Sequence, residues 1–78
     1  MTHIATFFSH FGAMRFKKLC DGLGWEATLM PVPRNLSSSC GTCVRFEGEC
    51  PKNPSDEVEQ IVELTPSGYV TRYRAKDS

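Results

Sequence analysis

The sequence predicts an α+β domain of the ferredoxin-like type, β-α-β-β-α-β, in which two helices cover one face of a four-stranded antiparallel sheet. Four short segments alternate apolar and polar residues, as half-buried strands do. Two other segments begin with helix-capping residues and then repeat apolar residues every three or four positions. A chain of 78 residues has room for one small core, so residues 1–78 are expected to form a single domain.

The first strand is predicted at residues 3–8, because HIATFF is rich in β-branched and aromatic residues. A helix should follow Ser9, whose hydroxyl can accept a hydrogen bond from a free backbone N–H of the first turn. Gly22 and Gly24 are typical helix terminators. One face of this helix should pack on the sheet, and its apolar members are Ala13, Phe16, Cys20 and Leu23.

The second strand is predicted at residues 25–30 and ends at Pro31, which lacks the N–H that a ladder needs. Residues 31–41 contain two prolines, three serines and an asparagine, a composition typical of a loop. A loop this long in so small a domain usually has a function. The alternating segment CVRFE predicts the third strand at residues 43–47.

A second helix is predicted from Asn53 to near Leu64, with Asn53 as the cap and Pro54 at the first helical position. Its first turns carry the acids Asp56, Glu57 and Glu59. Its inward face should consist of Val58, Ile61 and Val62. A turn at residues 66–68 then leads to a last strand at residues 69–74.

Charge and composition exclude several partners. Nine Lys and Arg balance nine Asp and Glu, so the weak net field argues against nucleic acid and against an anionic membrane surface. The N-terminus lacks the features of a signal peptide, and no segment nears the roughly 18 apolar residues of a membrane span. We therefore expect a cytoplasmic protein, in which four cysteines indicate thiol chemistry or metal binding more than a disulfide scaffold.

The pair Cys40 and Cys43, in SSSCGTC, has several interpretations. A thioredoxin-like dithiol needs a helix after the motif, and the alternating VRFE disfavours one. The spacing C-x2-C-x6-C of Cys40, Cys43 and Cys50 can hold zinc or iron, although three ligands do not close a structural zinc site. Burial as a small hydrophobic residue explains Cys20 best, because of its helical spacing.

The remaining interpretation is a single reactive thiol at Cys40. A thiolate is favoured by nearby cations and by backbone N–H groups, which a serine-rich loop with a glycine can supply. The candidate binding residues around this thiol are Arg34, Ser38, Ser39, Gly41 and Arg45.

The stretch LMPVPRNLSSSCG, together with Phe8-Ser9 and Ala13, resembles the selenium/sulfur carrier-like family of small bacterial domains. The resemblance covers residues 4 to about 47. It depends on the order and spacing of Pro31, Pro33, Arg34, Ser38, Cys40 and Gly41. It implies a carrier, in preference to a turnover enzyme, that holds sulfur or selenium on Cys40 as a persulfide or selenopersulfide. Its partners would be donor and acceptor proteins of sulfur or selenium metabolism, and no cofactor is implied.

The chain departs from the family pattern at Cys43, a position that is usually apolar, and at Cys50, in a segment that looks inserted. Cys43 can then act as a resolving thiol for Cys40, or all three thiols can form a zinc or iron site. A further alternative is a non-catalytic interaction module, whose open sheet face or strand edge recruits a partner or pairs with a second copy as a homodimer.

Overall fold

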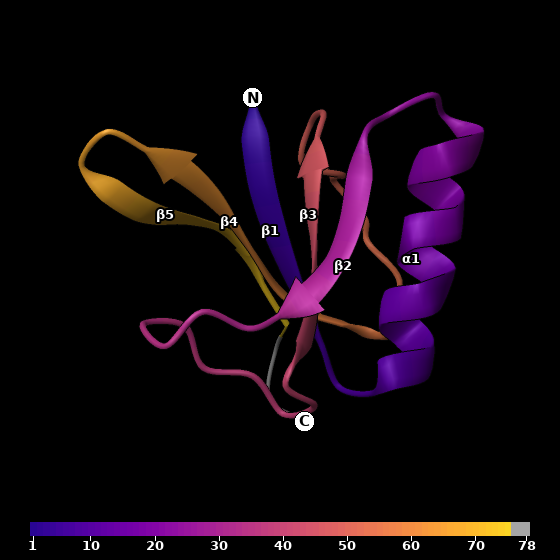
Figure 1. Ribbon diagram of the computed structural model, residues 1–78, viewed down its shortest axis with the longest axis horizontal. Coiled ribbons are helices and arrows are strands. Elements are labelled where there is room, and N and C mark those ends of the chain that lie inside the picture. Colours follow the sequence, from indigo (N-terminus) through magenta and orange to yellow (C-terminus); the bar gives the residue numbers. More distant parts are fainter. Residues whose placement is uncertain (76–78) are drawn as a thin grey trace.

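The strand β1 (Thr2–Phe7) lies at the centre of a five-stranded antiparallel sheet with the order β2-β3-β1-β4-β5 (Figure 1). The computed structural model describes residues 1–75. The other strands are β2 (Ala27–Pro31), β3 (Thr42–Glu47), β4 (Val58–Thr65) and β5 (Gly68–Arg74). The edges of the sheet are therefore β2 and β5.

The helix α1 (His10–Gly22) connects β1 to β2 and begins as the sequence predicts. The Ser9 hydroxyl accepts a hydrogen bond from the Gly12 N–H at 3.2 Å, which satisfies one free donor of the first turn. Of the predicted inward face, Ala13, Phe16 and Cys20 are buried. Leu23 is 54% exposed, so the prediction that it packs on the sheet is wrong.

The predicted second helix is wrong, and with it the ferredoxin-like arrangement. Its apolar positions lie in β4, which pairs with β1 on one side and with β5 on the other. The β1–β4 ladder shifts register between Thr6 and Phe7, which leaves Glu59 as an extra residue of β4, so Val58 and Ile61 both belong to the main core without strict alternation. The resulting spacing of three and four residues imitates a helix, and pairing along an eight-residue strand overrides weak helix signals.

The main core lies between α1 and the sheet, and Phe46 of β3 is at its centre. The Phe46 ring stacks on His3, with ring centroids 5.4 Å apart, and on Trp25 at 5.9 Å. Phe16 meets it edge-on at 5.1 Å. A Cβ at Gly48 would overlap the Trp25 ring, so the loop after β3 lies directly against this stack.

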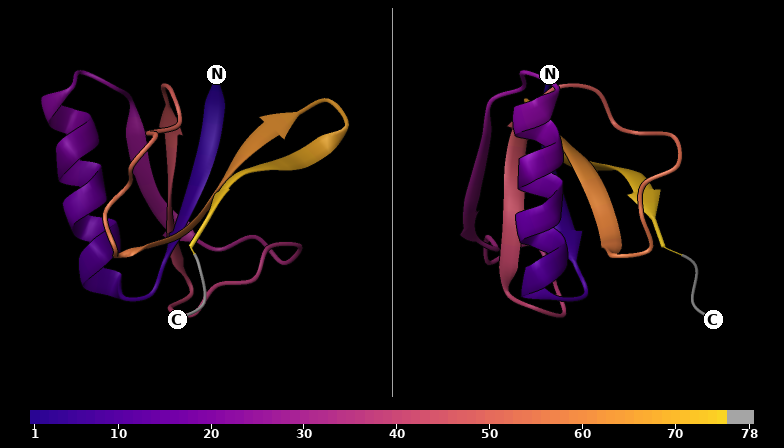
Figure 2. Two further views of the ribbon diagram at one scale, coloured as in Figure 1. Left: turned by 180° about the vertical axis from the view of Figure 1, so that it is seen from behind. Right: turned by 90° about the vertical axis from the view of Figure 1, so that its right-hand side faces the viewer.

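The opposite face of the sheet has a smaller apolar cluster, made of Ile4, Cys43 and Val62. Val32 and Leu36, from the loop between β2 and β3, pack against it, so this face is partly covered by a loop and has no helix. Figure 2 shows α1 on one side of the sheet, with the β4–β5 hairpin extending away from the helix. Across residues 1–75, no helix has the length and apolar character needed to cross a membrane.

Candidate functional site

The loop of residues 32–41, which joins β2 to β3, carries the thiol singled out by the sequence. Its base is closed by a hydrogen bond from the Val32 N–H to the Gly41 carbonyl at 3.1 Å. Gly41 has a φ of 75°, in the left-handed region that favours glycine. The chain can therefore reverse there and enter β3 at Thr42.

Two polar side chains of β4 fix the serines of this loop. The Glu59 carboxylate accepts hydrogen bonds from the Ser39 N–H at 3.1 Å and from the Ser39 hydroxyl at 2.8 Å. The Gln60 amide donates to the Ser37 carbonyl at 3.1 Å. Bonds to a carboxylate are stronger than bonds between neutral groups, so Glu59 is the main anchor.

Cys40 follows these anchors and is half-buried, with its side chain against the main core. Its Sγ donates a hydrogen bond to the Thr42 carbonyl at 3.3 Å, and its N–H donates to the Ser38 hydroxyl at 3.4 Å. A thiolate has no proton to donate and would be repelled by the Thr42 oxygen. The observed rotamer therefore suits the neutral thiol, and a charged sulfur would have to rotate toward solvent.

The end of the loop lies beside the first turn of α1. The Nδ1 of His10 is 3.3 Å from the Thr42 hydroxyl oxygen, and the Ser38 hydroxyl donates to the Phe7 carbonyl at 3.5 Å. The N-terminus of a helix carries a partial positive charge, which favours nearby anions. The partial positive charge of the α1 N-terminus therefore lies at the same end of the molecule as Cys40.

Cys43 lies in a different environment from Cys40. It is fully buried in the smaller cluster on the opposite face, where its Sγ donates to the Pro31 carbonyl at 3.7 Å. Burial, with a smaller contribution from the Cys40 sulfur, raises the pKa of the Cys43 thiol to about 11. All four cysteines are free thiols, and Cys43 is a poor nucleophile where it stands.

Cys50 lies beyond the other end of β3, roughly 16 Å of strand away from the start of that strand. Its Sγ donates to the Pro51 carbonyl, and burial raises the pKa of its thiol. It shares a mainly apolar pocket of about 300 Å³ with Cys20. No three His, Cys, Asp or Glu side chains within residues 1–75 are grouped to hold a metal ion, so Cys40, Cys43 and Cys50 are not brought together as a zinc or iron site requires.

The two predicted arginines do not contact the Cys40 thiol. Arg34 is exposed on the loop, and Arg45 is exposed on β3 with Glu26 and Glu47 beside it. Neither makes an ion pair or a side-chain hydrogen bond with any residue in the described range 1–75. Of the predicted binding residues, Ser38, Ser39 and Gly41 shape the loop.

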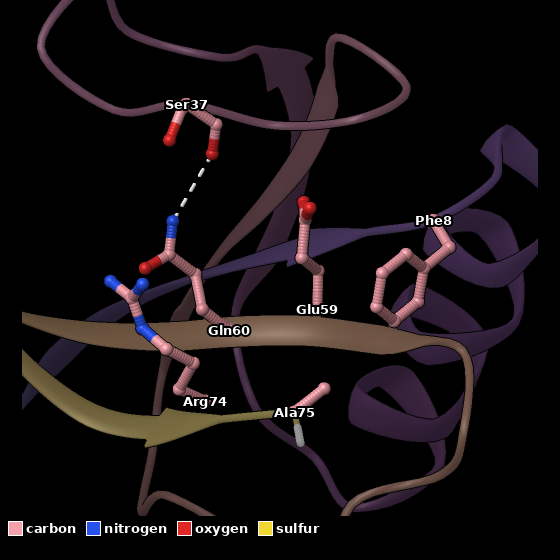
Figure 3. Close-up of a pocket in the computed structure, with 6 residues that line it drawn as sticks. All are labelled: Phe8, Ser37, Glu59, Gln60, Arg74 and Ala75. Carbon is pink, nitrogen blue, oxygen red and sulfur yellow. Dashed lines mark hydrogen bonds between the residues drawn. The ribbon is translucent and has the colours of Figure 1, made fainter. Parts of the chain in front are cut away.

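A pocket of about 140 Å³ opens between the loop and the β4–β5 hairpin (Figure 3). It is lined by Phe8, Ser37, Glu59, Gln60, Arg74 and Ala75. Glu59 and Gln60 were missed as site residues because a helix was predicted from Asn53 to near Leu64. Arg74 was missed although its strand was predicted, because nothing local marks the end of that strand as part of a site. The available signal was weak: a Glu-Gln pair inside the apolar run VEQIVEL.

The fold and the site together define the class of protein. It is a small antiparallel-sheet domain with a half-buried thiol at the end of an anchored loop, just before β3. The chain belongs to the family described as "Putative Se/S carrier protein-like", which matches residues 2–66. This match confirms the resemblance seen in the sequence and extends it through β4. No curated protein and no solved structure matches the chain.

Proposed function

We propose that this protein carries sulfur or selenium on Cys40, as a persulfide or selenopersulfide, between donor and acceptor proteins. The observation that supports this best is the placement of Cys40: it is half-buried at the end of an anchored loop, whereas Cys20 and Cys43 are fully buried. A carrier needs an accessible thiol more than it needs a deep pocket. The family description points in the same direction.

Loading is a thiol exchange that balances without an oxidant. The Cys40 thiolate attacks the outer sulfur of a donor persulfide, a new S–S bond forms, and the donor's S–S bond breaks with its electron pair on the donor thiolate. Unloading repeats the step, with an acceptor thiolate attacking the outer sulfur held on Cys40. A selenopersulfide follows the same course with selenium as the outer atom.

The resting geometry favours a distinct loaded conformation. The neutral Cys40 thiol donates to the Thr42 carbonyl, a bond that a charged outer sulfur cannot make. The loaded side chain therefore turns toward solvent, close to the first turn of α1. Phe8 and Phe11 flank this end of the molecule and are 49% and 64% exposed, which gives donor and acceptor proteins an apolar surface to contact.

Intact-mass measurement tests the proposal. The protein is incubated anaerobically with a cysteine desulfurase that has been charged with cysteine and then separated from free cysteine, and the expected product carries one added sulfur. Cys40→Ser should remove the added mass, whereas Cys50→Ser, which changes the other half-buried cysteine, should retain it. An added sulfur that persists in Cys40→Ser would exclude Cys40 as the carrier.

A further inference from the structure

The pocket beside the loop holds two opposite charges that do not neutralise each other. Glu59 and Arg74 both line it, and they come from the neighbouring strands β4 and β5. Among the ion pairs of residues 1–75, none joins these two side chains. Figure 3 shows the Arg74 guanidinium beside the Gln60 side chain, which stands between it and Glu59, and the Glu59 carboxylate turned toward the loop.

Both charged groups keep hydrogen-bonding capacity. A carboxylate has about four acceptor positions. Glu59 uses three of them, for the N–H and hydroxyl of Ser39 and for the Thr6 hydroxyl. The Arg74 guanidinium offers five N–H donors, none of which bonds another side chain in the part of the chain that the structure describes. One acceptor and several donors therefore remain for a ligand.

The complementary ligand has a cationic and an anionic group a short distance apart. We propose that this pocket binds the α-amino acid group of a small thiol, of the class of free cysteine, with its ammonium at Glu59 and its carboxylate at Arg74. A volume of about 140 Å³ suits a molecule of that size, since one water occupies about 30 Å³. The polar lining disfavours an apolar ligand.

The pocket is close enough to Cys40 for such a thiol to react there. Ser39, whose N–H is 3.1 Å from the Glu59 carboxylate, directly precedes Cys40. With one residue of chain added, the carboxylate lies within about 8 Å of the Cys40 Cα. The side chain of a bound cysteine and a rotated Cys40 side chain can span that distance together.

This inference rests on the proposed persulfide at Cys40 and adds a small thiol, beside acceptor proteins, as an acceptor of its outer sulfur. The thiolate of the bound cysteine attacks the outer sulfur, forming cysteine persulfide. The bond from Cys40 to that sulfur breaks, and its electron pair stays on the Cys40 thiolate. The proton lost by the ligand thiol goes to solvent, and solvent protonates Cys40, so the step needs no oxidant or reductant.

Binding is measured first with a probe that cannot accept sulfur. S-methylcysteine, titrated into the full chain by NMR, should shift the amides of residues 37–40 and of Gln60. Arg74→Met should weaken its affinity at least about 10-fold, because the ligand carboxylate loses its charged hydrogen bonds. Arg45→Met, which removes an exposed arginine on β3, is the matched control and should bind as the wild type does.

Two analogues keep the test independent of variant folding. 3-(Methylthio)propanoate lacks the ammonium and S-methylcysteamine lacks the carboxylate, so both should bind the wild type at least about 10-fold more weakly than S-methylcysteine. Equal affinities for the three compounds, undetectable binding of S-methylcysteine, or unchanged affinity in Arg74→Met would overturn the pocket assignment.

Transfer is measured separately on persulfidated protein. Cysteine should accept sulfur faster than 2-mercaptoethanol, and Arg74→Met should remove that preference. If S-methylcysteine binds through Arg74 but no persulfide forms on Cys40, the proposed function fails and the pocket assignment stands. If the persulfide forms and cysteine shows no preference that depends on Arg74, the carrier stands and the acceptor inference fails.

Discussion

The two loops at opposite ends of β3 are of equal length, and each carries a half-buried cysteine, yet they are held in different ways. The 32–41 loop is anchored by polar side chains of β4, chiefly Glu59. Within the described residues, the 48–57 loop has no such side-chain anchor: backbone hydrogen bonds hold its two ends, and packing places Gly48 against the Trp25 ring and the Glu57 side chain against Gly12. Polar anchors fix the backbone without covering it, whereas packing brings apolar surface over the chain.

This difference decides what a cysteine in each loop can do. In the 48–57 loop, burial raises the pKa of the Cys50 thiol, and Arg72 offsets this only in part. In the 32–41 loop, hydrogen bonds hold the residues before Cys40, and the sulfur lies at the margin of the main core. The mode of anchoring, rather than the presence of a cysteine, distinguishes the proposed carrier thiol from the others.

The largest effect that can test this distinction is on the rate of alkylation. We expect iodoacetamide to modify Cys40 first and Cys43 last in the native protein. The Cys43 pKa of about 11, against its ordinary value of 9.0, lowers its thiolate fraction at neutral pH about 100-fold. Peptide mass mapping over time, in buffer and in urea, measures this effect. Native labelling of Cys43 as fast as in urea would contradict it.

Substituting one glycine in each loop compares the two modes of anchoring directly. Gly48→Ala would force its new Cβ into the Trp25 ring and should cost about 1–3 kcal/mol of unfolding free energy through overpacking. Gly41→Ala meets no atom within 4 Å, so only its left-handed backbone opposes it, at about 1 kcal/mol. Urea denaturation measures both, and a larger loss for Gly41→Ala would reverse the comparison.

Local sequence signals predicted the elements whose patterns are complete within a few residues. The Ser9 cap predicted the start of α1, and alternation predicted β1, β2, β3 and β5. They failed at β4, where a capping residue, a proline and spaced valines suggested a helix. The bulge that breaks alternation in β4, at Glu59, arises from pairing with β1, about fifty residues away in the chain, and no local pattern records that pairing.

The candidate site, too, was predicted only where its signals are local in the sequence. Cys40 and the loop around it were predicted, because proline, serine and glycine specify a loop locally. The residues that hold the loop, Glu59 and Gln60, contact it only after β4 joins the sheet. Arg45 was expected near the thiol by closeness in sequence, but it lies five residues along from Cys40, exposed on β3.

The buried thiol of Cys43 should make the stability of the protein depend on pH. The pKa of Cys43 is raised on folding, so above pH 9 the unfolded chain loses this proton before the folded chain does. Stability should therefore fall as pH rises from about 9 toward 11, with about 1.3 kcal/mol lost by pH 10. Cys43→Ala should show a shallower decline in urea denaturation at each pH. Equal declines would mean that this thiol is not the cause.

The smallest expected effect concerns the main anchor of the 32–41 loop. Glu59→Gln keeps the size of the side chain but weakens its bonds to Ser39, so unfolding free energy should fall by about 0.5–1 kcal/mol. Amide hydrogen exchange at Ser39 should accelerate, while residues 48–57 stay as protected as in the wild type. Glu57→Gln is the matched control, because it keeps the packing of this side chain against Gly12 and loses only a 3.7 Å ion pair with Arg15, which is 65% exposed. If Glu59→Gln leaves Ser39 protected, the carboxylate does not anchor the loop, and contacts such as the Gln60 bond to Ser37 must position Cys40 instead.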